Sequence, residues 1–198
     1  MHELAPIVTA LARYRARRNP LRRRLMRAAV AVILRESRQG TEVLVVERAQ
    51  RPGDPWSGDM GLPGGRIDDC DAASASTAAC RETAEETGLV LERSLGIGRL
   101  SDRLVPDHSR RRPMIVSPFV YRCPTEATIT TNHEIAAWQW LALAWLDEPE
   151  RRQRMLWRIG RLAKSMPCYD CGQGRKLWGL TLLMLDELRR VGHRQAHP

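Results

Sequence analysis

The sequence lacks any apolar segment long enough to span a bilayer, and its N-terminus lacks the order of a secretory signal. Such a signal places charges first, then an apolar core and a small-residue cleavage site. The five cysteines are an odd number in 198 residues, so a disulfide framework is not expected. These absences exclude a membrane partner and favour a protein of the reducing cytoplasm. With 43% hydrophobic residues, the chain can still bury a core.

Lysine is nearly absent, so arginine supplies almost all the cationic side chains behind the net charge of +9. Eight arginines fall within residues 13–27, "RYRARRNPLRRRLMR". Such a run either attracts a phosphate-rich partner, a nucleotide or RNA, or forms a solvated helix face. We favour a small nucleotide over nucleic acid as the partner, and the sequence leaves a homodimer open.

The distribution of apolar residues predicts one α/β (α+β) domain over residues 1–198, with a mixed β-sheet held between helices. Residues 1–25 form a basic helical extension, interrupted at Asn19-Pro20, and a closing helix at the C-terminus carries apolar side chains on nearly every turn. Segments rich in proline and glycine, residues 50–65, and in charge, residues 102–113, are predicted loops. Helices are predicted over residues 3–18, 73–87, 150–163 and 176–191, and strands over 27–37, 41–49, 89–100, 114–123 and 135–143.

Three carboxylates share one face of the predicted helix 73–87, because Glu82, Glu85 and Glu86 are spaced by three and four residues. Like charges at this spacing repel, and the C-terminal end of a helix also disfavours anions. A bound divalent cation would offset both unfavourable electrostatic effects, since carboxylate oxygens are the ligands that Mg²⁺ and Mn²⁺ prefer. The alternative is an exposed acidic face that forms salt bridges.

The residues around this cluster resemble the Nudix box, a loop and helix whose pattern ends in R-E-U-x-E-E-x-G-U, with U apolar. "LPGG" at residues 62–65 matches its start and "RETAEETGL", residues 81–89, matches its end, with Thr83 at one apolar position. The box covers residues 64–89. It departs from the pattern at Asp71, which stands where glutamate is usual and is separated from Arg81 by nine residues instead of seven.

Several segments outside the box are similar to those of the coenzyme A pyrophosphatase subfamily of Nudix hydrolases. They are "WSGDMGLPGG", residues 56–65, "SPFVY", 117–121, "TNHEI", 131–135, and "LWGLT", 177–181. The resemblance implies a Nudix fold with extra N- and C-terminal helices. It also implies hydrolysis of coenzyme A or acyl-coenzyme A to phosphopantetheine and adenosine 3',5'-bisphosphate.

The same resemblance implies a metal-dependent active site. Glu82, Glu85 and Glu86 would hold Mg²⁺ or Mn²⁺, with the Gly65 carbonyl as an additional ligand, and Arg81 would orient one of the carboxylates. Glu134 would be a further ligand or the general base. The arginines assigned to substrate binding are Arg48, Arg66, Arg110, Arg111 and Arg112.

Two other functions remain open at this point. The same chemistry could act on another nucleotide, such as a nucleoside diphosphate sugar, a dinucleotide or a nucleoside triphosphate. Alternatively, a Nudix-like protein could bind RNA through its basic N-terminal segment without turnover, although the three intact glutamates argue against this.

Tryptophan and cysteine give weaker signals. Trp138, Trp140 and Trp145 could stack on a base or pack in the core. The Cys168-x-x-Cys171 pair supplies only two of the four ligands that a structural zinc site needs, so we interpret both residues as loop cysteines.

Overall fold

The computed structural model describes residues 3–52, 57–71, 74–105, 113–159 and 162–193. Within these ranges, eight strands form a mixed sheet in the order β3-β2-β1-β7-β5, with β4 on β1, β6 on β7 and β8 on β2. The long strands β1 and β7 are parallel, and the other pairs are antiparallel. The strands are β1 Met26–Ser37, β2 Gly40–Arg48, β3 Met60–Gly61, β4 Gly64–Arg66, β5 Gly96–Arg99, β6 Arg103–Val105, β7 Met114–Arg122 and β8 Ile135–Ala142.

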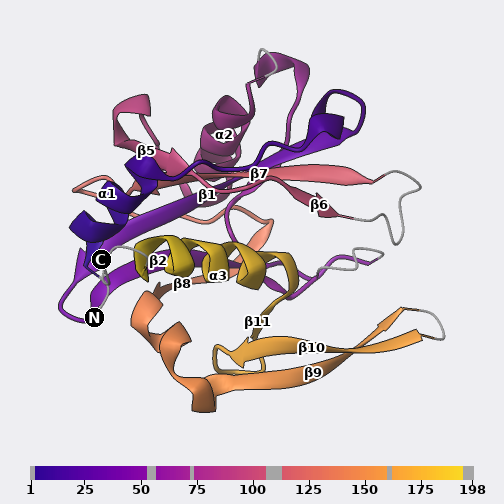
Figure 1. The fold of residues 1–198 in the computed structure, drawn as a ribbon. Coiled ribbons are helices and arrows are strands. Elements are labelled where there is room, and N and C mark those ends of the chain that lie inside the picture. Colours follow the sequence, from indigo (N-terminus) through magenta and orange to yellow (C-terminus); the bar gives the residue numbers. More distant parts are fainter. Residues whose placement is uncertain (1–2, 53–56, 72–73, 106–112, 160–161, 194–198) are drawn as a thin grey trace.

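Helices cover both faces of this sheet (Figure 1). Helix α2, Ala75–Thr87, lies on one face, and α1, Leu4–Arg13, and α3, Gly179–His193, lie on the other. None of the helices in the described ranges is long and apolar enough to cross a membrane. The predicted fold class, a mixed sheet between helices with additional helices near both ends, is confirmed.

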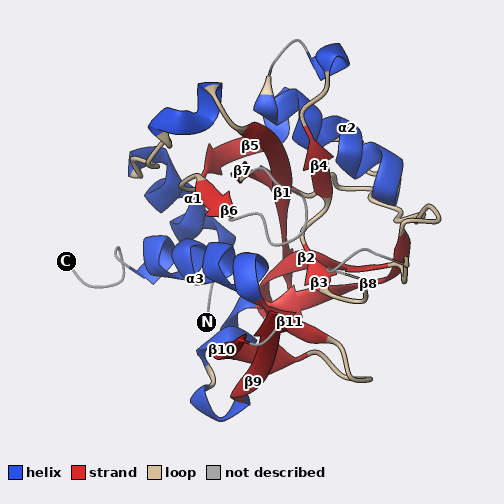
Figure 2. Ribbon diagram, turned by 90° about the vertical axis from the view of Figure 1, so that its right-hand side faces the viewer, coloured by secondary structure: helices blue, strands red, loops and turns tan. Residues whose placement is uncertain are grey.

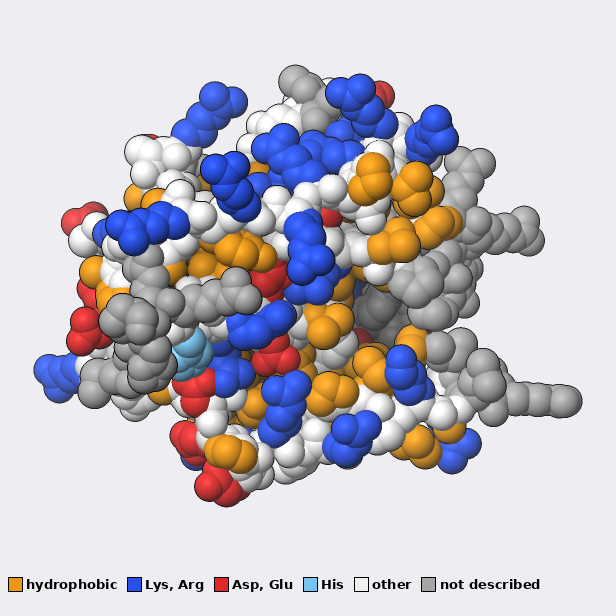
Figure 3. Space-filling model, viewed as in Figure 1, with side chains coloured by type: hydrophobic (Ala, Val, Ile, Leu, Met, Phe, Trp, Pro, Cys, Tyr) orange, Lys and Arg blue, Asp and Glu red, His pale blue; other side chains and the backbone are white. Residues whose placement is uncertain are grey.

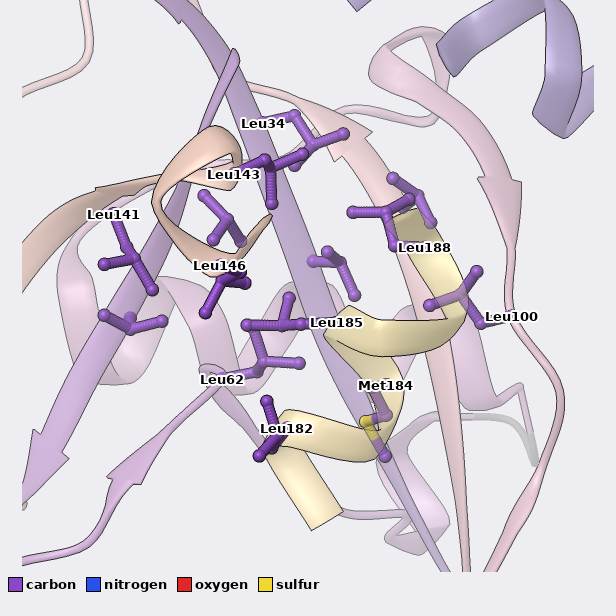
Figure 4. Close-up of a cluster of buried hydrophobic side chains, with 14 of the residues drawn as sticks. Leu34, Leu62, Leu100, Leu141, Leu143, Leu146, Leu182, Met184, Leu185 and Leu188 are labelled. Atoms are coloured by element: carbon purple, nitrogen blue, oxygen red, sulfur yellow. The ribbon is translucent and has the colours of Figure 1, made fainter. Parts of the chain in front are cut away.

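Strand β1 separates two cores because successive side chains of a strand point to opposite faces. Ala29, Ala31 and Ile33 pack toward α2, whereas Val32 and Leu34 pack toward α1 and α3. Figure 4 shows the second core, where leucines of α3 meet those of the sheet and of the 3₁₀ turn Leu143–Asp147. The small side chains on the α2 side let the helix approach the sheet closely.

The predicted helix over residues 150–163 is wrong. This segment forms β9, Arg152–Ile159, which pairs with β10, Leu162–Asp170, in an antiparallel hairpin that β11, Lys176–Trp178, extends. In both ribbon views this second sheet lies below β2 and β8 (Figure 2). The closing helix therefore begins at Gly179, after β11, and not at residue 176.

Other boundaries also differ from the predictions. Helix α1 ends at Arg13. Tyr14 has extended backbone angles, and its hydroxyl donates a hydrogen bond to Glu187 of α3. The predicted loop 102–113 contains β6, and only residues 96–99 of the predicted strand 89–100 are strand. The N-terminal extension is thus α-helical over ten residues and forms a 3₁₀ turn at Pro20–Arg23. Between them, the Arg17 N–H donates to Ser101 Oγ at 3.1 Å and the Asn19 N–H to Asp102 Oδ2 at 2.8 Å.

Candidate active site

The loop and helix of residues 64–88 are shaped by local sequence signals. Ser74 caps the start of α2, where its hydroxyl accepts from the Thr77 N–H at 3.4 Å. Gly88 ends the helix with φ +71°, and its N–H bonds to the Ala84 carbonyl. Thr83 stands at an apolar position of the box, and its buried hydroxyl is satisfied by the Ala79 carbonyl at 2.7 Å. The helix therefore presents its acidic residues in a fixed orientation.

Glu86 is the most buried of these acids, with 4% of its surface exposed. Its carboxylate accepts a hydrogen bond from the Gly64 N–H at 2.9 Å. Burial raises the pKa of Glu86 to about 7, an effect that the Gly64 hydrogen bond opposes and that the charges of Glu82 and Glu134 increase. The cation of Arg48 acts in the opposite sense, so Arg48 and Glu134 both lie near this carboxylate.

Glu82 lies directly above Gly65. A Cβ atom on Gly65 would come within 2.5 Å of the Glu82 carboxylate oxygens, so only glycine leaves room for this side chain. Burial raises the pKa of Glu82, against the opposing charge of Arg81, whose guanidinium lies 3.1 Å from Glu82 Oε1. The Gly-Gly loop and the acidic face of the helix are thus in contact.

Arg81 is fixed by the residue that departs from the usual pattern. Asp71 is completely buried and accepts two hydrogen bonds from Arg81, at 3.0 and 3.1 Å. Arg81 also binds the Arg66 carbonyl at 3.1 Å. The hydrogen bond from Arg81 holds the pKa of Asp71 below its ordinary value. The 3₁₀ turn Asp69–Asp71 places this carboxylate under Arg81 despite the longer spacing.

The donor set suits a hard divalent cation. Glu82 and Glu86 are carboxylates whose burial disfavours their charged forms, an effect that a bound cation would relieve. Glu85 is more exposed and pairs with Arg81 at 3.1 Å. In the ranges that the structure describes, no three acidic, histidine or cysteine side chains already converge as a metal site. Binding a metal through Glu85 would therefore require that side chain to leave Arg81.

The segment 130–134 is attached to the end of α2. The Thr130 N–H bonds to the Thr87 carbonyl at 2.9 Å, and the Asn132 N–H bonds to the Glu86 carbonyl at 3.2 Å. Glu134 follows, half-buried, with its Oε1 3.0 Å from Arg51 Nη2. The structure thus brings the candidate base, predicted from sequence, to the same end of the sheet as Glu86.

The arginines assigned to substrate binding are dispersed. Arg48 ends β2 beside Glu86, whereas the side chain of Arg66 is exposed at the end of β4. Residues 110–112 lie outside the described ranges. Basic side chains also occur over much of the face drawn in Figure 3, interspersed with hydrophobic ones. Positive charge alone therefore does not identify the substrate-binding residues.

Two residues of the site carry no clear signal in the sequence. Arg51, beside Glu134, lies in a predicted loop and is not part of any motif. Asp71 stands where the Nudix box usually has glutamate, but nine residues and not seven separate it from Arg81, so the spacing hides its pairing with Arg81. The run of acids at residues 68–71, ahead of an arginine at position 81, is the signal that could have indicated the Asp71–Arg81 pair.

The tryptophans and cysteines named in the sequence analysis lie in different environments. Trp140 joins the α2 core beneath the guanidinium of Arg35, Trp145 packs on Tyr169, and Trp138 remains 40% exposed. Cys168 is buried within β10, so its assignment to a loop is wrong, and Cys171 follows the strand half-buried.

A family model named NUDIX domain matches residues 25–159, which is more than half of the chain. The chain belongs to the Nudix family. The prediction of Nudix family membership is confirmed, and the match supports the predicted Nudix hydrolase class. The matched region contains the Gly-Gly loop, α2 and segment 130–134, and it ends within the β9–β10 hairpin.

Relatives of this Nudix domain include a protein of Schizosaccharomyces pombe described as uncharacterized, 35% identical over 117 residues. That alignment covers 57% of this chain and 35% of the relative, so the chain spans about a third of that protein. Two solved structures share the fold. A MutT/nudix family protein from Enterococcus faecalis has a TM-score of 0.56 at 18% identity, over 98% of this chain and 71% of that one. A MutT protein from Methanosarcina mazei has a TM-score of 0.53 at 15% identity, over 93% and 99% respectively.

Proposed function

We propose that this Nudix domain is a divalent-metal-dependent pyrophosphohydrolase that cleaves the diphosphate linking a nucleoside to a second group. Its proposed substrate is coenzyme A or an acyl-coenzyme A, with phosphopantetheine and adenosine 3',5'-bisphosphate as products. The observation that carries the hydrolase assignment is the buried Glu86, bound to the Gly64 N–H beside Glu82 and Glu134. The coenzyme A assignment is supported by the similarity of residues 56–65, 117–121, 131–135 and 177–181 to that subfamily.

The chemistry requires charge neutralisation and an activated water, because a diphosphate is anionic and repels hydroxide. Glu82, Glu85 and Glu86 would hold Mg²⁺ or Mn²⁺, which lowers the pKa of bound water and neutralises phosphate charge. Arg81, fixed by Asp71, keeps the acidic face in position. The half-buried cation of Arg48 would bind a phosphate oxygen next to Glu86.

Glu134 is the proposed general base. Its carboxylate would take a proton from the attacking water as the water oxygen bonds to one phosphorus and the bond from that phosphorus to the bridging oxygen breaks. The bridging oxygen leaves with the second phosphate. Arg51, whose Nη2 lies 3.0 Å from Glu134 Oε1, would orient this carboxylate toward the water.

A substrate panel tests this proposal directly. Coenzyme A, dephospho-coenzyme A, ADP-ribose and a dinucleoside polyphosphate are incubated with Mg²⁺ or Mn²⁺, and the products are identified by mass spectrometry. Glu86→Gln should lose most turnover without unfolding, because glutamine retains an oxygen for the Gly64 N–H. Glu150→Gln, on an exposed 3₁₀ turn, is the matched control and should retain full turnover.

The outcomes distinguish an error in the proposed substrate from an error in the proposed active site. Turnover of ADP-ribose or of the dinucleotide, but not of coenzyme A, contradicts the substrate and leaves the hydrolase assignment standing. Wild-type turnover that Glu86→Gln does not reduce contradicts the active-site assignment itself.

A further inference from the structure

The second sheet stands largely outside the family match. That match ends at residue 159, so β10, β11 and α3 lie beyond it. Strand β9 lies at the end of the match. Specificity for the non-reacting part of a substrate is expected in segments at the edge of the core that positions the chemistry.

One face of this sheet is rich in indole and thioether side chains. The register places Met155 opposite Met166, and it places Gln153, Cys168 and Trp178 in one row across the three strands. Since alternate residues share a face, Met155, Trp157, Met166 and Trp178 lie on the same side, which we term the indole face. All four are half-buried, and the rings of Trp157 and Trp178 are 5.6 Å apart. The neighbouring Leu156 points to the opposite face and is 56% exposed.

The indole face is attached to the edge of the candidate active site. The Trp178 indole N–H donates to Asp59 Oδ1 at 2.8 Å, and the Asp59 carbonyl accepts the Arg48 N–H at 3.1 Å. A second connection joins Arg175, which precedes β11, to Glu47 of β2 at 2.8 Å. Arg48 in turn lies near Glu86. These contacts join the indole face to the strand that carries Arg48.

We infer that the indole face binds the nucleobase of the substrate, stacked against Trp157. The inference rests on the proposed function only in placing a diphosphate at the carboxylates. A purine offers a flat π surface to an indole, and thioethers adapt to the edges of such rings. The bond from Trp178 to Asp59 fixes the orientation of the face relative to Arg48. The cation of Lys164, opposite Trp157 in the register, lies on the same face.

A pair of non-hydrolysable ligands isolates the contribution of the base. Adenosine 5'-(α,β-methylene)diphosphate and methylenediphosphonate share the diphosphate analogue, and only the first carries a nucleoside. Their dissociation constants are measured by calorimetry in Mg²⁺ for the wild type, Trp157→Ala, Trp157→Phe and Leu156→Ala. Trp157→Ala should weaken the nucleoside ligand on the order of tenfold, as expected for one lost stacking interaction, and leave methylenediphosphonate unchanged. Trp157→Phe should restore most of the affinity, and Leu156→Ala should match the wild type.

A second variant provides an independent test if Trp157→Ala does not fold. Trp178→Phe retains a ring but loses the hydrogen bond to Asp59, so it should weaken the nucleoside ligand several-fold and spare methylenediphosphonate. Equal effects on both ligands, or no effect on either, would overturn the inference and leave the hydrolase proposal standing. Nucleoside binding that depends on Trp157, in a protein that hydrolyses no diphosphate, would instead support the inference and contradict the hydrolase.

Discussion

Gly64 and Gly65, the adjacent glycines of the Nudix loop, should differ in the effect of substitution by alanine, because an added Cβ atom would meet different groups at the two positions. A Cβ atom on Gly64 would meet the backbone of the central strand β1, 2.6 Å from Val30 Cα, and its φ of +144° already disfavours a side chain. A Cβ atom on Gly65 would meet the carboxylate end of Glu82. A strand backbone cannot move aside without breaking its ladder, whereas a glutamate side chain can rotate.

The magnitudes follow from these obstacles. For Gly64→Ala, backbone strain of about 1–3 kcal/mol adds to overpacking of about 1–3 kcal/mol, so the free energy of unfolding should fall by roughly 2–6 kcal/mol. For Gly65→Ala the loss of stability should stay below about 1 kcal/mol. Displacement of Glu82 by about 1 Å should nevertheless lower kcat/KM on the order of 100-fold.

Urea unfolding and initial rates on the same preparations measure both effects. Gly174→Ala is the control for strain alone, because Gly174 has φ +78° and no other group lies within 4 Å of the position that a Cβ atom would take there. It should lose only the strain contribution, about 1–2 kcal/mol. If Gly65→Ala loses as much stability as Gly64→Ala, or retains full turnover, the placement of Glu82 over Gly65 is wrong.

Three further predictions concern the carboxylates. Adding Mg²⁺ or Mn²⁺ should raise the melting temperature of the wild type, because a ligand that binds only the folded state stabilises that state. The rise should be smaller in Glu82→Gln. Equal rises in both proteins would exclude Glu82 as a ligand. Asp71→Asn should lower the free energy of unfolding at pH 7 by roughly 1–3 kcal/mol, since Arg81 is partly exposed and solvent weakens the pair. The folded-state pKa of Asp71 lies below its unfolded value of about 3.9, so the stabilisation from its charge is complete above that pH and is lost as the pH falls through the folded pKa. Between about pH 2 and 5, the free energy of unfolding in urea should therefore fall less steeply with pH for Asp71→Asn than for the wild type. Parallel falls in the two proteins would contradict the pairing. Glu187→Ala should release the segment after Tyr14, seen as faster amide exchange there at unchanged kcat, because the alanine side chain offers no acceptor to the Tyr14 hydroxyl. Exchange that stays slow would mean that Glu187 does not anchor the segment.

The helix and its acidic face could be predicted because their signals are local. Ser74, Gly88 and the spacing of the glutamates all lie within one segment, and each determines structure through neighbours a few residues away. The β9–β10 hairpin could not be predicted in the same way. Arginine, leucine and methionine favour helices in residues 150–163, and only pairing with residues 162–170 makes the segment a strand.

The same limit applies to the site. The role of Asp71 depends on a 3₁₀ turn that shifts its carboxylate beneath Arg81, which residue counting against a fixed pattern does not reveal. The sequence does not indicate Trp157 and Trp178 as binding residues, because a helix over residues 150–163 gives them no common face. Once the strand register is known, the two indoles and the two methionines lie together.

Two buried glutamates, Glu86 and Glu187, differ in how far their surroundings compensate their charge. Glu86 and Glu187 are 4% and 5% exposed, yet their pKa values move in opposite directions. For Glu187, burial raises the pKa, but hydrogen bonds from the Ser101 N–H and the Tyr14 hydroxyl, together with the cation of Arg103, outweigh it. Glu86 receives the Gly64 N–H and faces the negative charges of Glu82 and Glu134, so its pKa rises. Nearby Arg81 is bound to Asp71, Glu82 and Glu85. The described residues therefore leave the charge of Glu86 incompletely compensated, and a divalent cation would supply positive charge there.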